Sequence, residues 1–161
     1  MAPPATDFRA LVDSLVAGGV DFVVVGGVAL VLQGAPRTTA DLDVCYARDP
    51  GNLDRLTAAL APLRPTLRGA PPGLPFRLDR RTLHSGLNFT LETIHGDLDL
   101  LAEITGVGGY HEVALDAVEV ELYGHRVRVM SLATLERAKR ATGRLKDLAD
   151  LAYLAELRRR R

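Results

Sequence analysis

The feature that most constrains this chain is residues 22–46, where two apolar runs flank a Gly-Gly pair and an Asp-x-Asp pattern. The first run, residues 21–25, is rich in β-branched residues, as is typical of a strand covered on both faces. Gly26 and Gly27 follow it directly, and residues 28–33 are a short predicted helix. Its free N–H groups would point at whatever lies over the turn, so the pattern predicts a strand–turn–helix unit suited to a phosphate.

Asp41 and Asp43 open a second predicted strand, residues 42–47. Side chains two apart on a strand point to the same face, with Cα atoms about 7 Å apart, so both carboxylates converge on one spot. Unpaired, they would repel each other and one would tend to hold a proton. A bound divalent cation explains such a pair most simply, and the pattern therefore predicts metal-assisted chemistry.

The composition indicates one ordinary domain. The chain has 161 residues, 47% of them hydrophobic, and 20 basic residues balance 20 acidic ones, which disfavours a protein that coats nucleic acid through bulk charge. A single cysteine, Cys45, can form neither an internal disulfide nor a cysteine metal cluster. Because no secretory leader and no apolar run of about 20 residues is visible, we expect a cytoplasmic protein without a membrane span.

The remaining pattern predicts a mixed α/β (α+β) chain. The expected elements are helices over residues 7–17, 53–60, 131–142 and 146–158, a proline-rich loop over residues 62–75, and hairpins over residues 87–104 and 118–130. The last helix has a predicted apolar stripe of Leu148, Leu151, Ala152, Leu154 and Ala155. We expect a core of residues 1–130 and two C-terminal helices, residues 131–161, that pack on it in one structural domain.

The order Gly26-Gly27, short helix, Arg37-Thr38-Thr39 and Asp41-Leu42-Asp43 resembles the polymerase-β-like nucleotidyltransferase superfamily. The resemblance implies a nucleotidyltransferase fold, in which a mixed sheet is flanked by helices. It also implies that Gly26 and Gly27 hold an NTP triphosphate, and that Asp41 and Asp43 bind one or two Mg²⁺ (or Mn²⁺) ions. A third carboxylate from a later strand would complete the site.

Two residues compete for the third carboxylate, since Asp97 and Asp99 share one face of the same predicted strand. The resemblance favours Asp99, as metal ligand or general base, because it lies within an apolar stretch while Asp97 adjoins the turn at Gly96. A turn-stabilising Asp is a common alternative role for Asp97.

Arg37 and Thr38 precede the Asp pair. An Arg can reach a phosphate oxygen there and a Thr hydroxyl can bond locally, although both residues also suit an ordinary surface loop.

The C-terminal segment carries a second resemblance, to abortive-infection type IV toxin nucleotidyltransferases of bacterial toxin–antitoxin pairs. Lys139 on one helix, and Arg144 and Asp147 at the start of the next, match its later motifs. It implies that Lys139 contacts a phosphate and that Asp147 orients Lys139 or Arg144. Charged residues on amphipathic helices often only face solvent, which is the plainer interpretation.

The sequence thus predicts a Mg²⁺-dependent enzyme that transfers NMP from an NTP to a hydroxyl. The acceptor is open between tRNA, a protein side chain and a small drug-like alcohol, and an antitoxin partner protein is expected for the toxin type. The alternatives are an antibiotic nucleotidyltransferase of the aminoglycoside type and a catalytically silent nucleotide-binding or partner-binding module.

Overall fold

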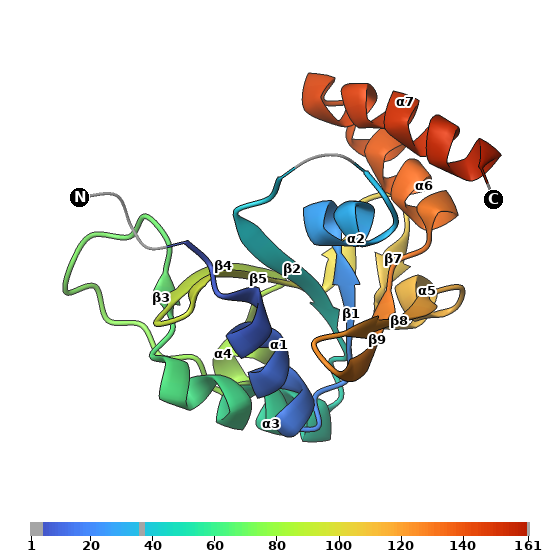
Figure 1. The fold of residues 1–161 in the computed structure, drawn as a ribbon. Coiled ribbons are helices and arrows are strands. Elements are labelled where there is room, and N and C mark those ends of the chain that lie inside the picture. The colour runs from blue at the N-terminus through green and yellow to red at the C-terminus, as the bar shows by residue number, and fades with distance from the viewer. Residues whose placement is uncertain (1–4, 36–37, 161) are drawn as a thin grey trace.

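The centre of the molecule is a mixed seven-stranded sheet, seen in a computed structural model that describes residues 5–35 and 38–160 (Figure 1). In sheet order the strands are β3 (Thr66–Leu67), β4 (Asn88–Thr93), β5 (Gly96–Leu101), β2 (Asp41–Tyr46), β1 (Phe22–Val25), β9 (His125–Val129) and β8 (Val118–Leu122). β2 runs parallel to β5 and β1 parallel to β9, and the other neighbours are antiparallel. Both predicted hairpins are present, as β4–β5 and β8–β9.

The helices cover both sides of this sheet. They are α1 (Phe8–Ala17), α2 (Gly26–Leu32), α3 (Pro50–Leu60), the 3₁₀ turn η1 (Ala61–Leu63), α4 (Arg80–Ser85), α5 (Tyr110–Ala114), α6 (Leu132–Thr142) and α7 (Leu145–Arg159). A separate small ladder joins β6 (Glu103–Ile104) to β7 (Gly108–Gly109). Figure 1 shows α1, α3 and α4 on one side, with α6 and α7 on the other, near α2.

Side-chain caps fix where several helices begin. The side chains of Asp7, Asp49, Asp79 and Ser131 each accept a hydrogen bond from the backbone N–H three residues later, which satisfies a donor that the helix itself leaves unpaired. Gly143, in the left-handed conformation, ends α6 as the sequence predicts.

The alternation along β2 and β5 divides the sheet into two chemically different faces. Leu42, Val44, Leu98 and Leu100 are fully buried in the core. The odd-numbered residues between them point to the other face, where Asp43 is paired in register with Asp99 across the parallel strands. The core side therefore fixes the register that brings the carboxylates together.

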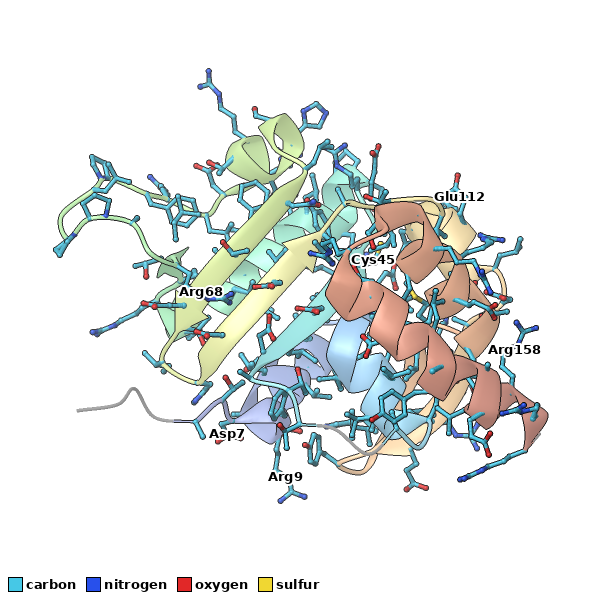
Figure 2. The ribbon with its side chains drawn as sticks, turned by 90° about the horizontal axis from the view of Figure 1, so that it is seen from above. Asp7, Arg9, Cys45, Arg68, Glu112 and Arg158 are labelled. Carbon is cyan, nitrogen blue, oxygen red and sulfur yellow. The ribbon has the colours of Figure 1, made fainter. Side chains whose placement is uncertain are left out.

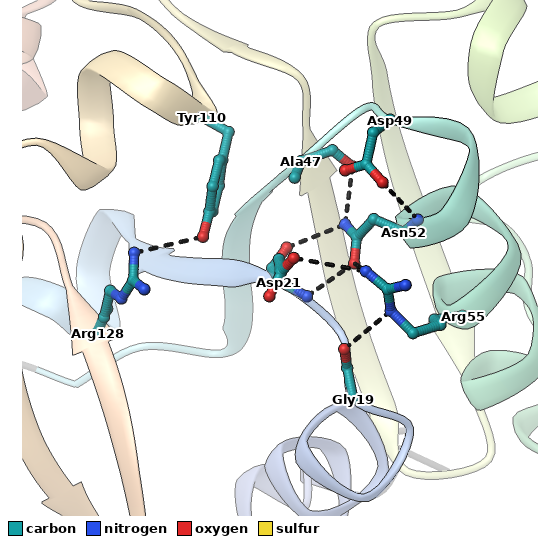
Figure 3. A network of polar contacts seen from close by, with 8 residues as sticks. All are labelled: Gly19, Asp21, Ala47, Asp49, Asn52, Arg55, Tyr110 and Arg128. Carbon is teal, nitrogen blue, oxygen red and sulfur yellow. Dashed lines mark hydrogen bonds and ion pairs between the residues drawn. The ribbon is translucent and has the colours of Figure 1, made fainter.

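A buried polar network ties the strand ends to α3 (Figure 3). Asn52, which is fully buried, accepts from the N–H of Asp21 at 2.7 Å and donates to the carbonyl oxygens of Asp21 at 3.1 Å and Ala47 at 2.7 Å. One amide thus connects the start of β1 with the end of β2, and satisfies backbone groups that would otherwise be buried unpaired.

Two local predictions require correction. On α7 the buried residues include Asp147, Asp150, Leu154 and Leu157, whereas Ala152 and Ala155 are exposed, so the predicted apolar stripe was wrong at those two alanines. The helix turns Asp147 and Asp150 inward because Lys139 on α6, whose side chain is only 13% exposed, pairs with both. The predicted loop over residues 62–75 also contains β3, which pairs with β4.

Across residues 5–35 and 38–160, none of the helices combines the length and the apolar character that a membrane span needs.

Candidate active site

Three carboxylates meet on the face of β2 and β5 that lies opposite the core leucines and valine of these strands. One oxygen each of Asp41 and Asp43, on β2, and of Asp99, on β5, lie within 4.8 Å of one another. Asp97 pairs in register with Asp41 beside the turn and lies outside this group. We call Asp41, Asp43 and Asp99 the acidic cluster.

The acidic cluster carries more negative charge than its surroundings neutralise. Burial, and then the neighbouring charges of Asp41 and Asp99, raise the pKa of Asp43 to about 8. Burial and a hydrogen bond with Asp41 also raise the pKa of Asp99, against the opposing effect of Arg68. Among the described residues, no group donates a hydrogen bond to Oδ1 of Asp43 although this atom is buried. Three carboxylates and an orphaned oxygen fit an oxygen-liganded divalent ion such as Mg²⁺ or Mn²⁺.

Both glycines are needed at this position because a side chain would not fit. Gly26 has φ +66°, and a Cβ on it would lie 2.1 Å from Oδ2 of Asp43. A Cβ on Gly27 would lie 2.9 Å from the hydroxyl oxygen of Thr39. Glycine therefore lets the start of α2 approach the acidic cluster more closely than any other residue could.

A cavity of about 640 Å³ joins the acidic cluster to the C-terminal helices. Its polar and charged lining residues include Thr39, Asp41, Asp43, Asn88, Glu103, Thr105, Lys139, Thr142 and Arg144, and both glycines also line it. Predicted site residues from the N-terminal and the C-terminal parts of the sequence thus line the same cavity. Of the predicted site residues, Thr38, Asp99 and Asp147 are absent from the lining. Thr38 is exposed, and its neighbour Thr39 is part of the lining. Arg37 lies outside the described residues.

On the far wall of this cavity lie Lys139, Thr142 and Arg144, which contact two buried carboxylates outside the lining, those of Asp147 and Asp150. We call these five residues the helix cluster. Nζ of Lys139 lies 2.9 Å from Asp147 Oδ1 and 3.1 Å from Asp150 Oδ2. Asp147 Oδ2 also accepts from Thr142 at 2.5 Å and from Nε of Arg144 at 2.6 Å. Burial alone would raise the pKa of Asp147, but these hydrogen bonds outweigh burial and hold that pKa well below its usual range.

Arg68 is the residue at this site that the sequence did not mark. It lies over β4 and β5 (Figure 2), and its Nη2 donates to Asp99 Oδ1 at 2.7 Å. Its Nε lies 3.4 Å from Asp97 Oδ2. The sequence shows an Arg inside the proline-rich segment of residues 62–75, but it does not show which strand this segment pairs with.

Cys45, which shares its face of β2 with Asp41 and Asp43, is fully buried (Figure 2). Burial raises its pKa to about 12, with a further contribution from the negative charge of Glu112. The thiol is therefore protonated at neutral pH and acts as a packing residue.

Comparisons with known proteins give a structural likeness only. No protein-family model matches the chain, and no curated protein matches its sequence. Among solved structures it resembles the lincosamide antibiotic adenylyltransferase LnuA with lincomycin bound, with a TM-score of 0.59 and 15% identity over 96% of this chain and 99% of that one. The mixed sheet flanked by helices is therefore a nucleotidyltransferase fold, as expected. Nothing in this likeness concerns the toxin type, which stays a prediction.

Proposed function

We propose that this protein is a divalent-metal-dependent nucleotidyltransferase that moves an NMP from an NTP to a hydroxyl group. The observation that carries the proposal is the acidic cluster with its orphaned Asp43 oxygen, facing a cationic wall across one cavity. Phosphoryl-type transfer needs both features, since negative charge must be neutralised on the phosphates while the reacting oxygens are held in line.

The two walls of the cavity have separate roles in this proposal. Asp41, Asp43 and Asp99 hold Mg²⁺ or Mn²⁺, which supplies charge neutralisation at the α-phosphate and lowers the pKa of the attacking hydroxyl. Lys139 and Arg144 contact the β- and γ-phosphates, where the backbone at Gly26 and Gly27 leaves room for close approach.

In the transfer step the acceptor oxygen forms a bond to the α-phosphorus as the bond from that phosphorus to the β-bridging oxygen breaks. Pyrophosphate leaves along the cationic wall. In this proposal Asp99 either completes the metal ligands or takes the hydroxyl proton, and its raised pKa suits proton acceptance.

A small hydroxyl compound is the acceptor that we test first. The solved relative named above is an antibiotic adenylyltransferase, and a second cavity of about 470 Å³ adjoins the same strands. Its lining includes Phe8, Glu92 and Asp97, which suit a compound with a cationic group and an apolar part, and Thr39 lines both cavities. The tRNA and protein acceptors of a toxin-type enzyme are the second candidate, which rests on the match of Lys139, Arg144 and Asp147 to the later motifs of that type.

The test is transfer of label from each α-³²P NTP, with Mg²⁺ or Mn²⁺, onto a lincosamide, an aminoglycoside, total tRNA and total protein. Label should appear with the wild type and be lost in the double variant Asp41→Ala/Asp43→Ala. It should persist in Asp54→Ala, whose exposed carboxylate forms a surface pair with Arg80. The labelled acceptor names the substrate class, and co-purification of a partner protein would favour the toxin type.

Metal-dependent NTP binding without transfer to any acceptor would favour the silent binding module. No NTP binding at all would exclude the proposed function.

A further inference from the structure

Arg68 is anchored to the sheet at both its backbone and its side chain. Its N–H donates to the carbonyl of Thr90 at 2.9 Å, next to the pairing of Leu67 with Leu91. Nη2 donates to the carbonyl of Leu91 at 3.0 Å as well as to Asp99. The guanidinium is therefore held at a fixed place beside the acidic cluster, and only 28% of the side chain is exposed.

The charges around this guanidinium are uneven. Asp41, Asp43, Asp97 and Asp99 lie on one face of two neighbouring strands. Within the part of the chain that the structure describes, Arg68 is the cation that forms ion pairs with this group, to Asp97 and Asp99. The helix cluster cannot serve the same purpose, because Lys139 and Arg144 pair with their own carboxylates.

We propose that Arg68 is a positioning residue that holds Oδ1 of Asp99 and so presents the other oxygen of that carboxylate to the acceptor hydroxyl. The inference rests on the proposed function, because it gives Asp99 a part in the reaction. A planar guanidinium is suited to this task, since Nη2 donates to the Leu91 carbonyl and to Asp99 together while Nε lies 3.4 Å from Asp97. These contacts fix the direction of the Asp99 carboxylate. The fork also places a positive charge next to the metal site, where it repels a bound cation.

These two effects have opposite consequences when Arg68 is replaced, and this gives the proposal a distinctive signature. Arg68→Gln removes the charge, so Mn²⁺ should bind about tenfold more tightly. The same change frees Asp99 to rotate, so kcat should fall about a hundredfold while KM for the NTP stays within about twofold. Arg68→Lys keeps the charge but loses the fork, so its Mn²⁺ affinity should match the wild type while only part of the turnover returns.

The experiment has two parts. The full chain, washed with chelator, is titrated with Mn²⁺ while electron paramagnetic resonance monitors binding. Steady-state kinetics are then measured on the acceptor found above. Arg77→Gln is the matched control, because Arg77 lies in the same segment with a side chain that is 89% exposed. Tighter Mn²⁺ binding together with slower turnover in Arg68→Gln supports the proposal, because simple loss of folding would weaken both. Unchanged or weaker Mn²⁺ binding, or wild-type turnover, overturns it.

If Arg68→Gln fails to fold by circular dichroism, the Arg68→Lys variant decides alone. Wild-type kcat in that variant would overturn the positioning role. Failure of the proposed function would look different, since the wild type itself would then bind Mn²⁺ no better than Asp41→Ala/Asp43→Ala.

Discussion

The two walls of the central cavity both contain partly or fully buried charges, but they are balanced differently. In the helix cluster two cations face two carboxylates, and Asp147 accepts hydrogen bonds from three side chains. In the acidic cluster, among the described residues, one of the three carboxylates, Asp99, pairs with a cation, Arg68, and one oxygen of Asp43 has no partner. The charges of the helix cluster are balanced within the protein, whereas the acidic cluster has an excess of negative charge that fits a bound cation.

This difference separates a role in folding from a role in binding. A charge whose partners are all supplied by the protein stabilises the fold only as long as each partner stays. A carboxylate without a partner is an energetic cost in the absence of a ligand, and binding the ligand removes that cost. The same Asp→Asn substitution should therefore have opposite effects on the free energy of unfolding in the two clusters.

The largest expected change is in Asp147→Asn. Its side chain is 1% exposed, and the variant would leave Lys139 with one carboxylate and bring an amide N–H group towards existing donors. We expect a loss of about 3 kcal/mol in the free energy of unfolding, measured by urea denaturation. Glu119→Gln is the control, because its exposed pair with Arg126, at 3.7 Å, should contribute almost nothing. Equal effects in the two variants would contradict the contrast between the clusters.

The opposite sign is expected in Asp43→Asn. In EDTA at pH 8 the neutral amide removes repulsion within the acidic cluster, so the variant should be more stable than the wild type by about 1–2 kcal/mol. Added Mn²⁺ should stabilise the wild type and leave the variant almost unchanged, as thermal unfolding would show. If Asp43→Asn is less stable than the wild type when both are metal-free, then ionised Asp43 does not destabilise the fold.

The pH dependence of the metal-free protein gives a third test. Because the folded pKa of Asp43 is raised from 3.8 to about 8, the folded state binds more protons than the unfolded state between those values. Stability should therefore fall as the pH rises through this window, by at most about 1.4 kcal/mol per unit. The lowered pKa of Asp147 acts elsewhere, since its stabilisation is lost only as the pH falls below about 4. Urea denaturation in EDTA at pH 5, 6.5 and 8 would measure the slope, and Asp43→Asn should flatten it.

The smallest effect is expected in Arg144→Gln. The Arg144 side chain is 70% exposed although it contacts Asp147, so its loss should change the free energy of unfolding by less than about 1 kcal/mol. It lines the cavity, and we expect KM for the NTP to rise about fivefold with kcat nearly unchanged. A large loss of stability without a change in KM would assign Arg144 to the fold.

The sequence was sufficient for the parts of the site that depend on short-range pattern. The spacing of Asp41 and Asp43 predicted their common face, and the resemblance to nucleotidyltransferases favoured Asp99 over Asp97. Arg68 was not predictable in the same way, because its place depends on a two-residue strand that pairs with β4 across more than twenty residues. The inward position of Asp150 was also missed, since hydrophobic periodicity assigns such carboxylates to solvent, whereas a contact of Asp147 with Lys139 or Arg144 was implied only by the resemblance to toxin nucleotidyltransferases.

The order in which the chain is synthesised has a consequence for the cavity. All three carboxylates of the acidic cluster have been made once residue 101 has been added, but the opposite wall requires residues 139–150. A nascent chain between these points holds its anionic groups without the lysine and arginine that face them across the finished cavity. The last two helices therefore complete the pocket as well as the fold, and a chain that stopped after β9 would retain the carboxylates while lacking the cationic wall.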